Sequence, residues 1–189
     1  MSGFPKRKLK TTDDLQLRCK TFAKRKRFAN DFSSLQLGDT VYVSGDMLTM
    51  RDMAHKRIQM LLKGKKKIPF SLKGAVIFHA GPIVKKVGKN YRLVAIGSTT
   101  SRRMDKYMPM LNKLGVKAVI GKGGMKNVGS VLYLSYAGGC AALGAKMLKI
   151  KKVEWLDLGI PEAVWHLKAT NFGPLVVSIK GKRSLYKSF

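Results

Sequence analysis

The sequence predicts one mixed α/β domain at residues 35–189, preceded by a basic N-terminal extension at residues 1–34. Hydrophobic residues make up 45% of the 189 residues, which is enough to build a core. From residue 35 onward, short apolar runs bounded by glycine and polar residues are interspersed with a few stretches of helical periodicity. Because strand patterns outnumber helical ones and alternate with them in the second half, we expect a mixed α/β sheet structure.

The expected elements follow from the spacing of apolar residues and from turn and capping residues. Strands are expected at Thr40–Ser44, Gly74–His79, Tyr91–Ile96, Val116–Ile120, Val131–Leu134, Val153–Leu158 and Leu175–Ile179. Helices are expected at Leu15–Ala29, Arg51–Leu62, Met104–Leu114 and Gly138–Ile150. Thr49 is expected to cap the second of these helices. One side of that helix is expected to consist of Met53, Ile58, Leu61 and Leu62.

The charge balance is strongly basic, with 38 Lys and Arg against 10 Asp and Glu and a net charge of +28. Such a surface attracts phosphates, so a nucleic-acid-binding module is one alternative, and an acidic protein partner is another. The densest clusters are Lys6–Lys10, Lys24–Arg27 and Lys63–Lys67. Two of them fall in the extension, and no aromatic residues interleave with them as in single-strand binders. The sequence therefore favours nucleic acid less than other partners.

Compartment and cofactor expectations come from what the sequence lacks. No apolar run approaches the ~18 residues of a membrane helix, and residues 1–30 are charged where a signal peptide is apolar. We therefore expect a cytoplasmic protein. Its two cysteines, Cys19 and Cys140, are far apart and form no Cys-x-x-Cys pair. Neither a structural zinc nor an iron–sulfur cluster held by this chain alone is expected.

The segment Gly97–Asp105 is the first candidate site. It follows an expected strand and precedes an expected helix, which is where α/β proteins place ligands. Four consecutive hydroxyl residues, Ser98 to Ser101, exceed what a helix cap requires. Together with the helix-start amides they predict an anion cradle, in which Arg103 can hold a carboxylate through two parallel hydrogen bonds.

Three further segments follow expected strands. In Gly121-Lys122-Gly123-Gly124, the glycines let a ligand approach the backbone and Lys122 adds a charge, although a plain turn explains the pattern equally well. Arg51 and His55 are four residues apart on one helical face, where they can bind an anion and move a proton. His79-Ala80-Gly81-Pro82 predicts a strand end and a tight turn with an architectural role. These segments supply half an active site, which suits an enzyme whose electrophile comes from elsewhere.

Six ordered segments of this sequence resemble the β subunits of class I fumarases and L(+)-tartrate dehydratases. They are Gly45–Arg57 with its Arg-Asp-x-x-His core, His79–Pro82, Thr99–Asp105, Gly121–Met125, Trp155–Trp165 (WLDLGIPEAVW) and Phe172–Ile179 (FGPLVVSI). Their order and spacing cover about residues 35–186. The resemblance implies a swivelling β/β/α domain and a hydro-lyase that acts on a small dicarboxylate such as fumarate, malate or tartrate.

The resemblance also implies a partner and a role for individual residues. An α-type chain, or fused domain, would carry a 4Fe–4S cluster on three cysteines, with its open iron as Lewis acid, and this chain would bind no metal. Thr99 would sit where a proton is removed from carbon, and His55 would be an active-site histidine. The residues that would bind substrate are Arg51, Thr100, Ser101, Arg102, Arg103 and Lys122, of which Arg51, Arg103 and Lys122 would hold carboxylates.

Three positions depart from the family pattern. Ser98 stands where proline is usual, Arg102 where a small residue is usual, and Lys180 where aspartate is common. The first two flank the expected cradle, so the choice between fumarate and tartrate stays open. A non-catalytic scaffold subunit is a further alternative, but a scaffold has no need of the retained Arg51, Thr99, Arg103 and Lys122.

Overall fold

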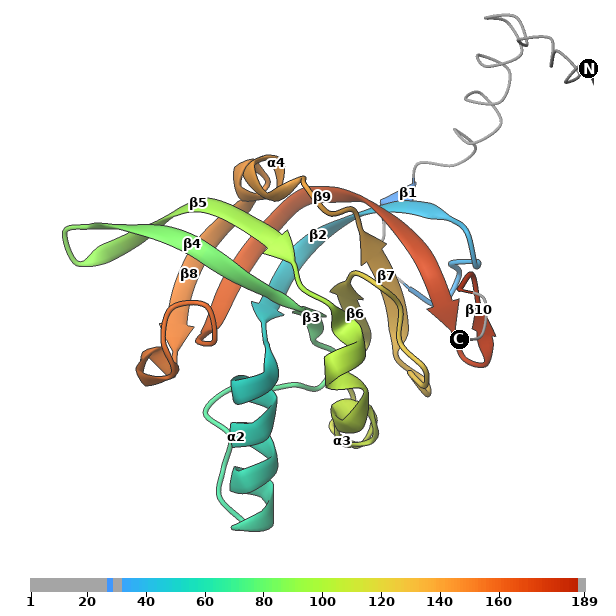
Figure 1. Ribbon diagram of the computed structural model, residues 1–189, viewed down its shortest axis with the longest axis horizontal. Coiled ribbons are helices and arrows are strands. Elements are labelled where there is room, and N and C mark those ends of the chain that lie inside the picture. Colours follow the sequence, from blue (N-terminus) through green and yellow to red (C-terminus); the bar gives the residue numbers. More distant parts are fainter. Residues whose placement is uncertain (1–26, 29–31, 187–189) are drawn as a thin grey trace, which may run out of the picture.

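The computed structural model describes residues 27–28 and 32–186, and its centre is a closed ring of five strands (Figure 1). The ring consists of β2 (Thr40–Thr49), β3 (Val76–Phe78), β6 (Ala118–Gly121), β7 (Leu132–Tyr136) and β9 (Val164–Lys180). The first four lie parallel to one another in that order. The 17-residue β9 is long enough to pair antiparallel with both β7 and β2, which closes the ring into a small barrel.

Alternation along the barrel strands divides the apolar residues into two cores. In β3, Val76 and Phe78 belong to one cluster and Ile77 to the other. β6 and β7 repeat this division, with Ala118, Ile120, Leu132 and Leu134 in the first cluster and Val119 and Tyr133 in the second. Successive side chains of a strand point to opposite faces, so one cluster fills the barrel and the other lies beneath the helices.

The remaining elements cover the barrel or extend from it (Figure 1). The helices α2 (Asp52–Lys63) and α3 (Met108–Lys113) lie on one side, with the 3-10 helix η1 (Ser101–Tyr107) leading into α3. The strands β4 (Ala80–Val87) and β5 (Asn90–Ser98) form a projecting hairpin, and α4 (Ala141–Lys146) packs near β5. β8 (Leu148–Glu154) pairs with β9, followed by η2 (Leu156–Leu158). The short strands β1 (Arg27–Phe28) and β10 (Arg183–Ser184) pair with β2 and β9.

The mixed α/β class is confirmed, and each expected strand except one corresponds to an observed strand, although β2 and β9 extend well beyond the expected Thr40–Ser44 and Leu175–Ile179. The exception is Val153–Leu158: β8 ends at Glu154 because Trp155 has a left-handed backbone (φ 58°), and a 3-10 turn follows. The expected helix at Leu15–Ala29 lies outside the described residues, apart from Arg27–Phe28 in β1. Among residues 27–28 and 32–186, no helix has the length and apolar character that a membrane crossing requires.

The expected helix at Gly138–Ile150 is wrong over most of its length. Only Ala141–Lys146 is helical, and the chain from Leu148 onward is strand β8. Glycine at positions 138 and 139 delays the helix start, with Gly139 at φ 83°. Pairing with β9 then overrides the helical propensity of the small residues, because Leu148 enters the barrel core as a strand residue.

Two details of the expected α2 helix are also wrong. Thr49 does not cap it: the Thr49 hydroxyl donates to the Ala163 carbonyl (3.3 Å) and accepts from the Trp165 amide (3.0 Å). The exposed amide of Met53 instead donates to the Glu162 carboxylate (3.0 Å). The buried face of the helix consists of Ala54, His55 and Ile58, whereas Met53 and Leu62 are exposed.

Candidate active site

The candidate site lies where the parallel strands β2, β3 and β6 end. Arg51 follows β2, His79 follows β3, and Lys122 follows β6. The backbone pairing continues past the strand ends, because the Met50 amide donates to the Phe78 carbonyl (3.0 Å) and the His79 amide donates to the Ile120 carbonyl (2.8 Å). The carboxyl ends of neighbouring parallel strands meet at one edge, which brings three of the four candidate segments together.

His79 contacts both neighbouring segments at this edge. The tight turn expected at this residue is wrong. The residues after it begin strand β4, so His79-Ala80-Gly81-Pro82 forms no tight turn. The His79 ring is fully buried, its Nδ1 lies 2.9 Å from the Ser101 hydroxyl, and its edge meets the His55 ring at 5.4 Å. The His79 carbonyl accepts from the Thr99 amide (2.7 Å) and the Thr99 hydroxyl (3.2 Å). His79 therefore connects the α2 segment with the hydroxyl segment.

His55 is held in one tautomer. Its Nδ1 lies 2.8 Å from the Arg51 carbonyl, which can only accept, so Nδ1 carries the proton and Nε2 is a bare acceptor. The His55 ring is fully buried and stacks on Tyr107 with centroids 5.2 Å apart. Burial lowers the pKa of His55 to about 4, against weaker opposing effects of the Arg51 carbonyl and the Asp52 charge. Burial and the neighbouring His55 likewise lower the pKa of His79 well below its usual value.

These histidines make stability depend on pH. In the unfolded chain each imidazole takes up a proton near pH 6.5, whereas in the folded chain His55 does so only near pH 4. The unfolded state binds more protons between these values, so the stabilisation is present above pH 6.5 and is lost as pH falls toward 4. For His55 alone the loss is about 3 kcal/mol. Urea unfolding between pH 7 and pH 4 measures it.

The control for this pH dependence is His55→Phe, which keeps an aromatic ring against Tyr107 and cannot titrate. Its unfolding free energy at pH 7 falls, because the Arg51 carbonyl loses a donor, but it declines less steeply on acidification. Equal slopes in the two proteins would contradict a neutral, buried His55.

The hydroxyl segment is tied to the glycine segment by backbone pairing. The Ser101 amide donates to the Lys122 carbonyl (2.9 Å), and the Lys122 amide donates to the Thr99 carbonyl (3.3 Å). Glycine at 123 and 124 allows the left-handed turn that follows, with φ 80° and 68°. This pairing places the Lys122 side chain, which is exposed, beside Thr99 and Thr100.

Gly121 is required by the close approach of Ser101. A Cβ atom at position 121 would lie 1.8 Å from the Ser101 hydroxyl and 3.3 Å from the Tyr133 hydroxyl. We therefore expect Gly121→Ala to push Ser101 away from His79 and to lower the unfolding free energy by about 1–3 kcal/mol. Chemical denaturation of the full chain measures this loss.

The double variant Gly121→Ala/Ser101→Ala is the matched control for that clash. Removing the Ser101 hydroxyl leaves its Cβ 3.2 Å from the new methyl group, a contact that small shifts relieve. Part of the lost stability should return, even though His79 loses its hydroxyl partner. A double variant less stable than Gly121→Ala would show that the collision is not the cause.

Two of the four cationic side chains predicted for the site have carboxylate partners on neighbouring segments. Arg51 forms an ion pair with Glu162 (Nε–Oε1 3.3 Å). The Arg51 side chain also lies close to Gly81, where a Cβ atom would be 2.9 Å from the Arg51 Nη1 atom. Arg103 of η1 pairs with Asp52 in the first turn of α2. Arg102 and Lys122 have exposed side chains. The guanidinium groups are thus fixed in direction by carboxylates that do not neutralise the whole site.

Seven of the eight residues predicted for the site are connected by the contacts above, whereas Arg102 follows Ser101 with an exposed side chain. The hydroxyl groups of the segment Ser98 to Ser101 differ in access. Ser98 donates to the Tyr136 carbonyl (3.1 Å), Thr99 donates to His79, and Ser101 is fully buried against His79. Three of the four hydroxyls therefore hold the segment in place, and only Thr100 is exposed. Thr99, which is half-buried, keeps its oxygen lone pairs for a ligand. The contacts of Ser101 and Thr100 with substrate stay a prediction.

Sequence reasoning missed several members of the network. His79 was recognised only as an architectural residue, although it follows a strand as the other candidates do. Asp52 was visible beside Arg51 in the Arg-Asp-x-x-His pattern. Glu162 and Tyr133 gave no local signal, because their roles depend on contacts with residues far away in the sequence.

Unpartnered polar atoms gather at this site. The Nε2 atoms of His55 and His79 and the hydroxyl of Tyr133 are buried without a hydrogen-bond partner among the residues that the structure describes. Burial raises the pKa of the Tyr133 hydroxyl, which therefore stays protonated as a donor. Buried polar atoms without partners are costly, so their gathering is typical of a functional site rather than of a purely structural core.

The described residues do not fit an iron–sulfur cluster. Among residues 27–28 and 32–186 no group of three or more His, Cys, Asp and Glu side chains could hold a metal ion. Cys140 is a free, half-buried thiol, and Cys19 lies outside the described residues. A cluster needs three or four thiolates, so these residues supply no ligand set for one.

The comparisons with known proteins agree with the resemblance. The chain is 46% identical over 159 residues to a putative L(+)-tartrate dehydratase subunit beta of Methanocaldococcus jannaschii, covering 79% of this chain and 82% of the relative. It is 40% identical over 160 residues to the L(+)-tartrate dehydratase subunit beta of Escherichia coli, covering 80% and 78%. It is 35% identical over 164 residues to a putative fumarate hydratase class I of Geobacillus stearothermophilus, covering 81% of this chain and 31% of the relative. The family model for the Fumarase C-terminus matches residues 4–189, and the chain belongs to that family.

Proposed function

We propose that this chain is the β-type subunit of an iron–sulfur hydro-lyase that adds or removes water at a small dicarboxylate. Membership of the Fumarase C-terminus family supports the reaction class. The names of the relatives support a subunit that acts with another chain, and substrates of the tartrate or fumarate type. A cytoplasmic location is part of the proposal and stays a prediction.

One observation carries the proposal. Arg51, Arg103 and Lys122, which come from three separate segments, gather with Thr99 at one edge of the barrel. A dicarboxylate needs two cationic clamps beside the group that handles the proton, and the gathering of these residues supports that use.

The residues of this chain would act in binding and in proton transfer. Arg51 and Arg103, directed by Glu162 and Asp52, would hold the two carboxylates, with Lys122 as a third cation. Thr99 would sit where the proton is removed from carbon, and its oxygen is positioned by the hydrogen bond to the His79 carbonyl. Because the hydroxyl already carries a proton, it would accept the substrate proton as an alkoxide, after releasing its own proton to water. The electrophile that the resemblance implies, a 4Fe–4S cluster on the α-type partner, would polarise the departing hydroxyl when bound.

The buried histidines would act by position rather than by contact. His55 and His79 are fully buried and neutral, so neither carries a charge to the substrate at neutral pH. The His55 Nδ1–H bond to the Arg51 carbonyl fixes the start of α2, and the His79 carbonyl fixes Thr99. They would keep the reacting groups aligned and would help to exclude water. Exclusion of water strengthens the electrostatic contacts of the site.

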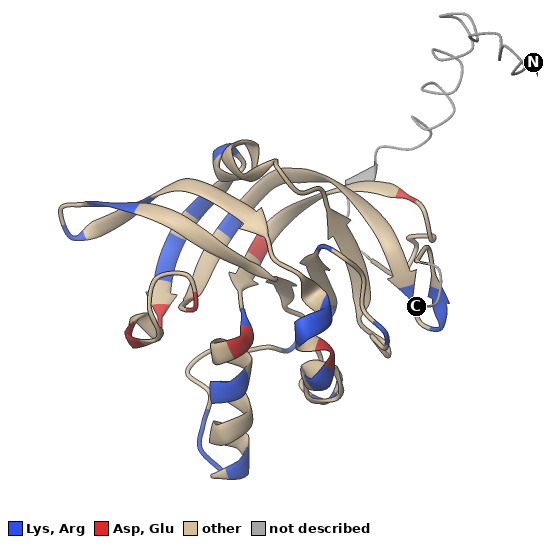
Figure 2. Ribbon diagram, in the orientation of Figure 1, with Lys and Arg blue, Asp and Glu red and all other residues tan. Residues whose placement is uncertain are grey.

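The alternative of a nucleic-acid-binding module has less support. Among the residues that the structure describes, Figure 2 shows Lys and Arg on the hairpin, on α2, on η1 and α3, on β8 and β9 and near β10, rather than in one stripe. A stripe or patch is the usual footprint of a nucleic-acid interface. The scattered charge would instead attract a dianionic substrate and an acidic partner.

The test is reconstitution. We expect no hydro-lyase activity from this chain alone, and activity with L(+)-tartrate, malate or fumarate once it is mixed anaerobically with a cluster-loaded α-type chain from the same genome. The ratio of kcat/KM for tartrate and malate then identifies the substrate. A reconstituted pair with a loaded cluster and no activity on any of the three would overturn the proposal.

A further inference from the structure

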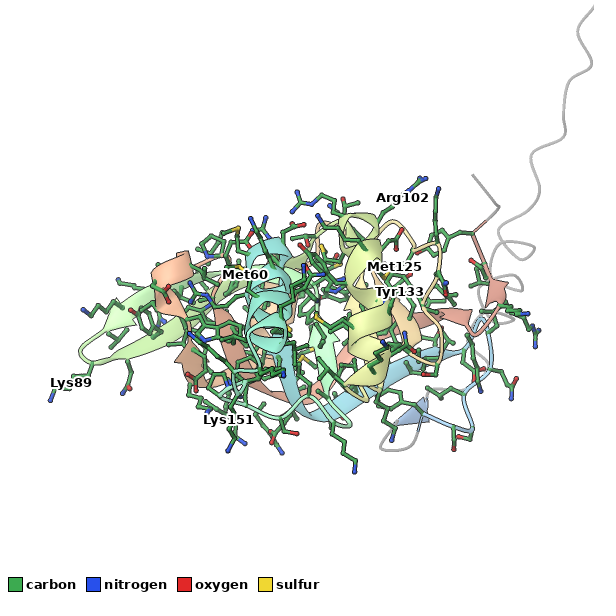
Figure 3. All side chains as sticks on the ribbon, turned by 90° about the horizontal axis from the view of Figure 1, so that it is seen from below. Met60, Lys89, Arg102, Met125, Tyr133 and Lys151 are labelled. Atoms are coloured by element: carbon green, nitrogen blue, oxygen red, sulfur yellow. The ribbon has the colours of Figure 1, made fainter. Side chains whose placement is uncertain are left out.

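A pocket opens on another side of the barrel, away from the candidate active site (Figure 3). It has a volume of about 590 Å³ and lies between β2, the segment before β3, and the strands β8 and β9. Its lining includes Asp46, Phe70, Lys73, Lys151, Lys152 and His166. Figure 3 shows Lys151 and Arg102 pointing outward at opposite edges of the molecule, so this pocket and the hydroxyl segment face different directions.

The charge around this pocket is positive by two units. Asp46 is shared by Lys151 (3.0 Å) and Lys168 (3.7 Å), and Lys152 pairs with Glu154 (2.9 Å). Lys73 has no carboxylate partner within the described part of the chain. The hydrogen bond from Lys151 lowers the pKa of Asp46, so that carboxylate is ionised at neutral pH. Within the lining itself, the ammonium groups of Lys73, Lys151 and Lys152 accompany the single carboxylate of Asp46, and the excess of two positive charges matches a dianion.

The wall of the pocket is apolar and aromatic. The buried residues Leu48, Val76 and Leu167 are among its lining. The Phe70 ring meets the His166 ring edge-on with centroids 5.5 Å apart. The Nε2 atom of His166 is buried without a hydrogen-bond partner among the described residues. Burial and the Lys152 charge lower the pKa of His166, so this ring is a neutral hydrogen-bonding group at pH 7.

From this combination we propose that the pocket is a binding site for a nucleoside monophosphate, separate from the site of the reaction. A phosphate monoester carries about −1.5 to −2 charge at neutral pH, which the lysines complement. A flat base can lie against Phe70 and hydrogen-bond to His166, as ligand sites use aromatic walls with a few polar groups. The volume of about 590 Å³ suits a ligand of that size and greatly exceeds a four-carbon dicarboxylate.

The proposal is tested by titration calorimetry on the full chain with adenosine 5′-monophosphate, inorganic phosphate and L(+)-tartrate as probes. We expect adenosine monophosphate to bind more tightly than inorganic phosphate, because the base adds contacts with Phe70 and His166. Lys73→Glu should weaken its binding at least about tenfold, since it removes a cation and adds a repelling charge. Phe70→Ala should weaken the binding of adenosine monophosphate but leave the binding of inorganic phosphate unchanged.

The matched control is Lys89→Glu, at the exposed loop between β4 and β5, which changes the net charge of the chain by the same amount. It should leave binding within about twofold of the unchanged chain, because Lys89 does not line the pocket and its exposed charge is screened by salt. Equal weakening by Lys73→Glu and Lys89→Glu would mean non-specific attraction and would overturn the proposal. Displacement by tartrate, equal affinity for inorganic phosphate, or no binding would also overturn it. None of these results bears on the hydro-lyase proposal.

Discussion

Replacing Thr99 by valine is expected to lower kcat of the reconstituted enzyme by roughly 100-fold to 10,000-fold, the range for loss of a general base. Valine has the shape of threonine and lacks its oxygen. The Thr99 amide would still donate to the His79 carbonyl (2.7 Å), so the segment would keep its place while the proton-accepting atom is lost. Steady-state rates with the best substrate, measured at saturating α-type chain, give the change.

Two measurements keep this result interpretable. Thr99→Ser keeps an oxygen that can donate to the same carbonyl, and it should retain most of the activity. The unfolding free energy of Thr99→Val should change by less than about 1.5 kcal/mol, the net worth of a typical hydrogen bond. A valine variant that works within threefold of the unchanged enzyme would remove Thr99 from the chemistry and would require another base.

The parts of the site that were predictable from the sequence are those with a local signature. An apolar strand followed by polar residues identified the segments at Arg51, Thr99 and Lys122, and parallel pairing of β2, β3 and β6 explains why such segments meet. Thr99 and Arg103 follow β5, which lies outside the barrel. Their place at the site depends on backbone hydrogen bonds to His79 and Lys122, which no periodicity reveals.

The parts that were not predictable depend on contacts between distant residues. Thr49 is a residue type that commonly caps helices, but its hydroxyl accepts a hydrogen bond from the Trp165 amide of β9. The Met53 amide of α2 donates instead to the carboxylate of Glu162, which lies 109 residues further along the chain. Gly138–Ile150 has the composition of a helix, but its last residues pair with β9 and form part of strand β8. In each case a tertiary partner outweighs a local preference of about 1 kcal/mol or less, which is the usual size of such preferences.

Replacing Arg103 by alanine is expected to lower kcat/KM of the reconstituted enzyme about 30-fold to 1,000-fold. This corresponds to about 2–4 kcal/mol of transition-state binding, as the loss of a charged hydrogen-bonding clamp typically costs. The fold should survive, because the Arg103–Asp52 pair is partly exposed and such pairs contribute about 0–1 kcal/mol. Asp52 would remain in the first turn of α2, where a negative charge is favourable. Initial rates at low substrate concentration measure the loss.

Three further variants separate a clamp from an ion-pair partner. Arg103→Lys keeps the charge but not the two parallel donors, so its kcat/KM should fall between the unchanged enzyme and alanine. Arg92→Ala, an exposed arginine on β5 with no place in the site, should leave kcat/KM unchanged. If Arg103 served only to hold Asp52, then Asp52→Asn would cost as much as Arg103→Ala. A direct clamp predicts instead a smaller loss for Asp52→Asn, because Arg103 would keep its charge and lose only the carboxylate that directs it.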